Sequence, residues 1–136
     1  MMSFVDVIHA FSDFIGGTGR SENDIAACEA ALGTSLAADY REYLASVGLA
    51  TFDGREITGI CTTERLNVVA VTMHQRSIKE DIPLDLYVVE ELGIDGVVVW
   101  QAPDGAVFLS APQNTMQKVG NCLADLYLPQ DTSGER

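Results

Sequence analysis

A tandem pair of helix-forming segments between residues 21 and 48 constrains the fold of this chain more than any other feature. The first segment opens with Ser21 and Asp24, a pattern in which a hydroxyl and a carboxylate satisfy free N–H groups at a helix start. Gly33 follows at the position where a left-handed cap ends a helix. The apolar residues between these ends recur with helical spacing at Ile25, Cys28 and Leu32. We therefore predict a helix of about three turns between Ser21 and Gly33.

The helical pattern restarts after Leu36. Asp39 would lie near the positive N-terminal end of a second helix, which Gly48 would close. The buried face of this helix would carry Tyr40, Leu44 and Val47. Further on, the dipeptide Asp53-Gly54 is flanked by apolar residues, which predicts a tight turn into a strand that runs through Ile60.

This stretch contains the segments ENDI, LG, DYREYL, FDG, EI and GI in that order, and the progression resembles the N-terminal half of the SUKH superfamily (SMI/KNR-like proteins). The matching positions are Ile25, Leu32, Gly33, Leu36, Tyr40, Leu44, Gly48, Phe52, Gly54, Glu56, Ile57 and Gly59. The resemblance implies an α+β fold. Members are best known as bacterial immunity proteins against polymorphic and contact-dependent toxins, and a fungal branch regulates cell-wall synthesis. Most of the matching positions are fold residues, so the resemblance alone assigns no site.

Strand signals dominate the second half of the chain. We predict strands at residues 86–89, 97–100 and 107–109, and the turn residues Pro103, Asp104 and Gly105 should join the last two in a hairpin. Helical segments that precede a cluster of strands argue against alternating βαβ units. The predicted fold is a single α+β domain over residues 1–136. In it, the N-terminal helices and a C-terminal helix pack on a mainly antiparallel sheet.

Several local predictions complete this picture. A first helix should carry Phe4, Ile8, Phe11 and Ile15 on one face, with Ser3 as its cap. Residues 16–20 should be a flexible break, and 66–73 fits either a strand or a helix, of which the resemblance favours the helix. Thr115 should cap a last helix whose apolar face holds Met116, Val119, Leu123 and Leu126. We expect the polar tail 129–136 to be mobile and both Tyr40 and Trp100 to be core aromatics.

The charge of the chain is strongly negative. Twenty Asp and Glu against eight Lys and Arg give a formal net charge of -12, which argues against nucleic-acid binding because phosphate contacts need basic clusters. No basic residue occurs between Lys79 and Lys118. The same interval holds Glu80, Asp81, Asp85, Glu90, Glu91, Asp95 and Asp104. Such a segment is either a solvated acidic surface that keeps the protein in solution or a surface that meets a basic partner.

The sequence lacks the patterns that catalysis and metal binding require. The only histidines, His9 and His74, have no ligand-spaced companions, and there is no nucleophile motif. Glu90 and Glu91 are adjacent on a predicted strand, so their side chains should point to opposite faces and could not act as an acid–base pair. We therefore expect no enzymatic activity, no metal and no cofactor. The three cysteines, Cys28, Cys61 and Cys122, should be buried free thiols.

Two classes of function fit these observations. The first is a non-catalytic immunity protein that binds and neutralises a cognate toxin. A basic nuclease is one class of toxin that would suit the acidic charge of this chain. The second is an intracellular scaffold or regulatory module of the same superfamily. The chain has no run of about 20 apolar residues and no secretory signal, so we expect a cytoplasmic protein with no membrane contact. The oligomeric state stays open. The partner-binding candidates are Glu90, Glu91, Asp95 and Asp104, with Asp53 and Glu56 as second candidates.

Overall fold

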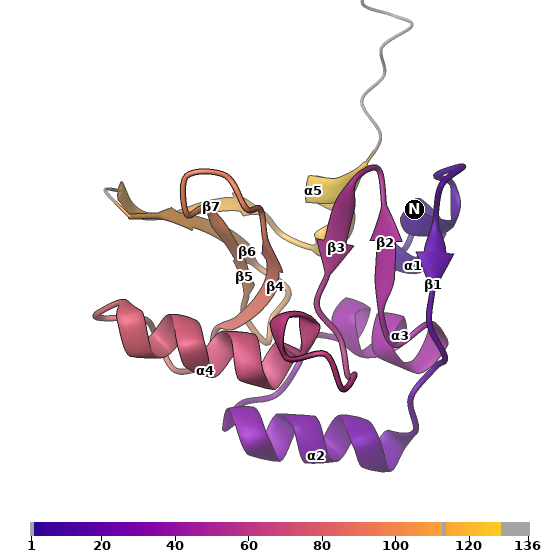
Figure 1. Ribbon diagram of the computed structural model, residues 1–136, viewed down its shortest axis with the longest axis horizontal. Coiled ribbons are helices and arrows are strands. Elements are labelled where there is room, and N and C mark those ends of the chain that lie inside the picture. The colour runs from indigo at the N-terminus through magenta and orange to yellow at the C-terminus, as the bar shows by residue number, and fades with distance from the viewer. Residues whose placement is uncertain (1, 113, 129–136) are drawn as a thin grey trace, which may run out of the picture.

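The computed structural model describes residues 2–112 and 114–128, which form five α-helices, one 3-10 helix and two antiparallel sheets (Figure 1). The helices are α1 (Phe4–His9), α2 (Glu22–Leu32), α3 (Ala38–Ser46), η1 (Glu64–Leu66), α4 (Val68–Ile78) and α5 (Leu123–Tyr127). The three-stranded sheet has the order β1 (Ile15–Gly16), β2 (Ala50–Phe52) and β3 (Arg55–Ile57). The four-stranded sheet has the order β4 (Tyr87–Glu91), β5 (Val98–Gln101), β6 (Val107–Ala111) and β7 (Asn114–Gly120). The predicted α+β architecture is confirmed.

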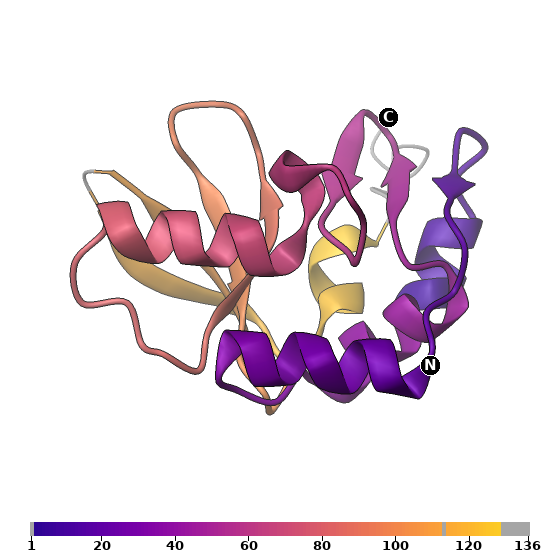
Figure 2. The same ribbon diagram turned by 60° about the horizontal axis from the view of Figure 1, so that its bottom comes forward.

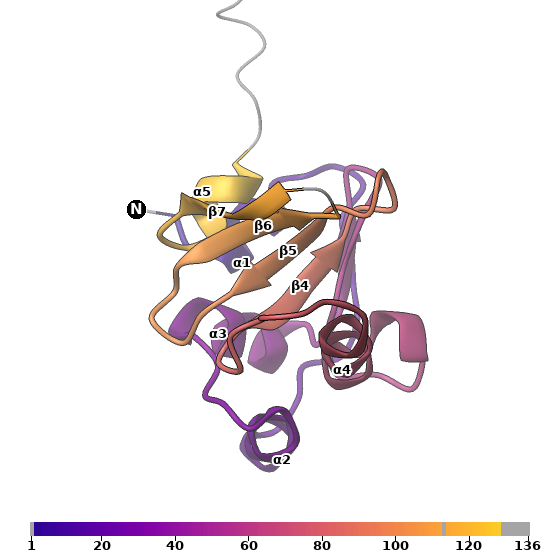
Figure 3. The ribbon, with the colours of Figure 1, turned by 90° about the vertical axis from the view of Figure 1, so that its left-hand side faces the viewer.

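The four-stranded sheet separates two hydrophobic clusters. The main cluster joins α1, α2, α3, α5 and the first residue of α4, Val68, to the small sheet and to one face of the large sheet. The large sheet contributes Tyr87, Val89, Val99 and Val107. The second cluster lies on the opposite face, where α4 covers β4 and β5 (Figure 3). Its buried members are Val71, Leu86, Val88, Val98 and Trp100. Tyr40 and Trp100 are both fully buried, as predicted.

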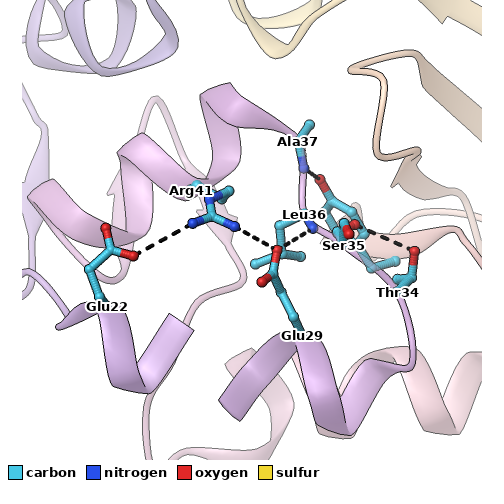
Figure 4. A network of polar contacts seen from close by, with 8 residues as sticks. Glu22, Glu29, Thr34, Ser35, Leu36, Ala37 and Arg41 are labelled. Carbon is cyan, nitrogen blue, oxygen red and sulfur yellow. Dashed lines mark hydrogen bonds and ion pairs between the residues drawn. The ribbon is translucent and has the colours of Figure 1, made fainter. Parts of the chain in front are cut away.

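The tandem helices form as the sequence indicates. The Ser21 hydroxyl accepts a hydrogen bond from the Asp24 N–H at 3.1 Å, and Gly33 ends α2 with a φ of 77°. An ion-pair network holds the two helices together (Figure 4). In it, Arg41 of α3 donates to Glu29 of α2 at 2.9 Å, and the same carboxylate accepts from the N–H of Leu36 at 2.8 Å. The connection between α2 and α3 is therefore fixed by side chains as well as by packing.

Thr58 ties the tandem helices to the large sheet. Its N–H donates to Val89 at 2.9 Å and its hydroxyl donates to the Val88 carbonyl at 2.8 Å. The Tyr40 hydroxyl donates to the Thr58 carbonyl at 3.0 Å and lies 2.9 Å from the Thr58 Oγ1. The Tyr43 hydroxyl donates to the Thr58 carbonyl at 3.0 Å. Burial raises the pKa of both tyrosines, so they remain neutral donors.

Both predicted hairpins are present. Asp53 and Gly54 have φ values of 53° and 71° and connect the paired strands β2 and β3. β5 and β6 are antiparallel, and the Gly105 N–H donates to the Ala102 carbonyl at 2.9 Å to close the turn between them. The helix favoured over residues 66–73 is also confirmed, as α4. The strand expected to run through Ile60 is shorter and ends with β3 at Ile57.

The N-terminal predictions need two corrections. The Ser3 cap is present, but α1 ends at His9 rather than continuing to Ile15. Ile15 instead pairs with Thr51 of β2, because tertiary pairing overrides the helical spacing. Residues 16–20 are not a loose break: the Gly17 N–H donates to Leu49 at 2.8 Å, and a Cβ at Gly19 would collide with the Ala45 carbonyl. The glycines are needed for close backbone approach.

The predicted C-terminal helix from Thr115 is wrong over its first half. Asn114–Gly120 is strand β7, paired with β6, and the helix α5 begins only at Leu123. The spacing of Met116, Val119, Leu123 and Leu126 fitted one helix although it spans two elements. Cys28 is buried as expected, whereas Cys61 and Cys122 are only partly buried. The tail 129–136 lies outside the described residues, so its expected mobility is untested.

Candidate protein-binding surface

Glu90 is part of the interior. Its side chain is 4% exposed, and its carboxylate accepts hydrogen bonds from Arg55 at 2.7 and 3.1 Å and from the Tyr127 hydroxyl at 2.7 Å. The Arg55 guanidinium also lies 4.5 Å from the centre of the Tyr127 ring. Burial and the Glu90 carboxylate raise the pKa of Tyr127. This arrangement joins β3, β4 and α5, and it removes Glu90 from any surface that a partner could reach.

Glu91 points the opposite way, as strand alternation predicts. It is exposed at the end of β4 and accepts a hydrogen bond from the buried Gln75 amide of α4 at 2.6 Å. One of the two adjacent carboxylates is thus a structural group, while the other faces solvent. The partner of Glu90, Arg55, could not be identified from the sequence because the two residues are 35 positions apart.

Three turns lie on the same side of the molecule, spread along its long axis, and we call this side the turn end: residues 10–14, 53–54 and 92–97. All three lie at the top in both Figure 1 and Figure 2. Contact between two of them is direct, because both Asp13 carboxylate oxygens lie 2.9 Å from the Asp53 N–H. Asp95, with a φ of 53°, is exposed in the third turn, next to the end of β4 that carries Glu91. Asp13 was not among the residues predicted from the sequence, since its neighbours give no signal.

The carboxylates of the turn end are not held in ion pairs by the residues that the structure describes. Among the described residues, none of the ion pairs involves Asp13, Asp53, Glu91 or Asp95. Glu56, one strand away, differs because Arg65 donates to both of its oxygens at 2.6 and 3.1 Å. These hydrogen bonds lower the pKa of Glu56. The turn end is therefore rich in carboxylates outside the ion pairs of the described residues, although Arg55 lies close enough to Asp53 for their charges to interact and Arg65 lines the same cavity as Glu91.

Asp104 lies elsewhere. It is exposed in the turn between β5 and β6, and its Oδ1 accepts from the Ala106 N–H at 3.0 Å. Because β5 runs away from the turn that holds Asp95, Asp104 is at the opposite end of the large sheet (Figure 1). The structure thus places Asp53, Glu91 and Asp95 on the same side of the molecule, with Glu56 one strand from Asp53, and puts Asp104 at the opposite end of the large sheet.

The described residues offer little for other kinds of site. Within residues 2–112 and 114–128, no three His, Cys, Asp or Glu side chains gather where they could hold a metal ion. None of the helices in the same ranges is long and apolar enough to cross a membrane. His9 is exposed, with its Nδ1 2.8 Å from the Val5 carbonyl, and His74 is exposed on α4.

A comparison with protein families gives a match over most of the chain. The model of the family SUKH_5, described as SMI1-KNR4 cell-wall, matches residues 4–118. This range includes all seven strands except the last two residues of β7, and it excludes α5. A search of curated proteins found no match.

Proposed function

This chain belongs to the SUKH (SMI1-KNR4) family, and from that premise we propose that it is a non-catalytic immunity protein that neutralises a cognate bacterial toxin by binding it. Members of the superfamily act on protein partners, and the proposal makes that partner a toxin domain with a basic surface. The observation that carries it is the turn end, where Asp53, Glu91 and Asp95 are exposed and belong to none of the ion pairs within residues 2–112 and 114–128. Stoichiometric inhibition needs no catalytic residues, only a complementary surface.

The charge of the turn end suits the capture of a basic protein. Carboxylates of one sign on neighbouring turns add their fields, and such a field raises the rate of encounter with an oppositely charged surface. Because these side chains are exposed, they would set chiefly the association rate and its salt dependence rather than the final affinity. A basic nuclease would be a suitable target, since its own active surface must attract phosphates.

The first test is protection. A candidate toxin domain from a gene neighbouring this one would be expressed in a bacterium with and without this chain, and growth would be measured. We expect this chain to restore growth and the two purified proteins to form a 1:1 complex. Absence of both effects would contradict the immunity function and favour the regulatory module, whose partner would be another protein of the same cell.

A further inference from the structure

A groove opens on the α4 side of the large sheet, between the end of α4 and the β6–β7 hairpin. Its cavity volume is about 640 Å³. Both of these elements lie on the left of Figure 1. The groove is lined by residues that include Ile78, Glu80, Ile82, Ser110, Pro112 and Met116. It lies beyond the part of the sheet that α4 covers.

The floor of the groove is apolar and continuous with the second hydrophobic cluster. Ile82, Phe108 and Met116 pack against that cluster while remaining partly exposed. The polar group on the floor is already satisfied, because the Ser110 hydroxyl accepts from the Trp100 indole N–H at 2.9 Å. On this face the main chain of β6 is paired on both sides, and the free edge of the neighbouring β7 points outward in the plane of the sheet, away from the groove floor. A ligand would therefore be held by side-chain packing, which favours a helix that satisfies its own main chain.

The rim of the groove is acidic and carries exposed apolar side chains. Glu80 and Asp81 lie on the connection that follows α4, with Lys79 as their cationic neighbour. Ile78 is 60% exposed and Leu84, on the same connection, is 72% exposed. Exposed large apolar residues beside acidic ones are typical of a surface that meets an amphipathic basic partner.

The connection that forms this rim is held in place. Arg76 donates to the carbonyls of Leu84 and Leu86, at 2.8 and 3.1 Å, and to the Leu32 carbonyl of α2 at 3.1 Å. Its guanidinium is thus used to fasten the backbone of the connection. A preformed groove loses less entropy when it binds than a groove that must first become ordered.

The groove adjoins the turn end. Gly96, in the turn between β4 and β5, packs so closely on the hairpin that a Cβ there would lie 2.8 Å from the Pro112 Cγ. Pro112 also lines the groove. A partner drawn to Asp95 by charge would consequently arrive beside the apolar floor.

We propose that this groove docks a basic amphipathic helix of a partner protein. Its apolar side chains pack on Ile82 and Met116, and its Lys or Arg side chains face Glu80 and Asp81. The identification of the partner as the toxin rests on the proposed function, whereas the chemistry of the docked helix does not. A second copy of this chain is a poor occupant, because two acidic rims on molecules with a net charge of -12 would repel each other.

The test uses a defined probe, a fluorescent helical peptide of about 14 residues that contains only leucine and lysine, with leucine at helical spacing. A scrambled peptide of the same composition is its control. Binding would be measured by fluorescence anisotropy, and the site would be mapped by NMR shifts of the Ile78, Ile82 and Met116 methyl groups. We expect the helical peptide to bind about tenfold more tightly than the scrambled one and to shift these methyl signals. Equal binding of the two peptides would overturn the proposal.

Matched variants separate packing from charge. Met116→Glu places a carboxylate in the groove, whereas Val119→Glu adds the same charge to a residue of β7 that is 38% exposed and does not line the groove. We expect Met116→Glu to weaken binding about tenfold and Val119→Glu to leave it unchanged or slightly stronger. If both variants bound as the parent does, the association would be electrostatic only and the groove would not be the site. Should Met116→Glu fail to fold, Ile78→Glu tests the other wall with the same expected loss. Because the probe is not the toxin, failure of protection and failure of docking are separate results.

Discussion

The two faces of the large sheet differ in how completely they are covered. On the first face, the main cluster is closed by four helices, the start of α4 at Val68 and the small sheet. On the second, α4 covers β4 and β5, while Phe108 and Met116 of β6 and β7 remain partly exposed. The closed face resembles the core of any small domain. The partly open face leaves apolar surface beside an acidic rim and beside the turn end.

The difference indicates how the chain divides its residues between folding and binding. The matching SUKH positions that are buried apolar residues all belong to the main cluster: Ile25, Leu32, Leu36, Tyr40, Leu44, Phe52 and Ile57. None of them belongs to the second cluster. The buried apolar residues that carry the resemblance in the N-terminal half therefore build the closed face. Glu56, which is also a matching position, is exposed at the border of the turn end.

Replacing Glu90 or Glu91 by Ala tests this division with two adjacent carboxylates. Glu90→Ala would leave the half-buried Arg55 guanidinium without its partner, which should reduce the free energy of unfolding by about 3–5 kcal/mol. Glu91→Ala removes an exposed side chain and one hydrogen bond from Gln75, at a cost of about 1 kcal/mol. Denaturant unfolding of both variants measures the contrast. Equal losses would show that Glu91 is also a structural residue.

Two phenylalanines, one on each face of the large sheet, test the same difference in coverage. Phe52 is 1% exposed in the main cluster, and Phe52→Ala should cost about 3–5 kcal/mol of stability. Phe108 is partly exposed on the other face, so Phe108→Ala should cost only about 1–2 kcal/mol, because much of its ring area is already in water. Thermal melting of the two variants would test this order, and a larger loss at Phe108 would mean that the second face is not open in solution.

Raising the pH into the alkaline range should reduce the stability of the folded protein through a buried thiol of the closed face. Burial raises the pKa of the Cys28 thiol from 9.0 to about 11, so the folded state retains a proton that the unfolded state loses. This contribution is complete below pH 9.0 and is lost as the pH rises toward about 11, by about 2–3 kcal/mol in total. With Cys28→Ala, the free energy of unfolding, measured with denaturant, should fall less steeply across this pH range. Cys122→Ala, which changes a partly buried thiol, should not; a flattened decline in that variant would contradict the assignment to Cys28.

Local sequence signals predicted much of the fold. The capped helix α2 and the Asp53-Gly54 turn follow from residues within a few positions of each other, and such signals act through the local backbone. The errors arose where distant partners decide the structure. Ile15 pairs with Thr51, and the segment of Met116 pairs with β6, so in both places pairing across the sheet overrides a helical spacing. No pattern confined to the segment itself shows this.

The candidate surface was predictable only in part, for a related reason. The one-signed charge of the interval after Lys79 was visible in the sequence, as was the opposite orientation of Glu90 and Glu91. Which carboxylates lie on the same side of the molecule was not, because Asp13, Asp53 and Asp95 of the turn end come from three separate turns. The burial of Glu90 depends on Arg55 and Tyr127, which come from different elements.

The most direct test of the division between folding and binding is the rate at which the toxin domain associates at low ionic strength. Asp53→Asn, Glu91→Gln and Asp95→Asn together remove three charges from the turn end, and asparagine tolerates the positive φ of both turn positions. The matched control removes three charges elsewhere, with Glu22→Gln, Glu42→Gln and Asp104→Asn.

Stopped-flow fluorescence would compare the parent with the two triple variants. We predict that the turn-end variant associates several-fold more slowly at low salt, roughly three- to tenfold, and approaches the parent as salt screens the field. The control should remain close to the parent, and the stability of both variants should change by no more than about 0.5 kcal/mol. Equal slowing of the two variants, or no slowing of either, would contradict the assignment of the turn end as the surface that meets the partner.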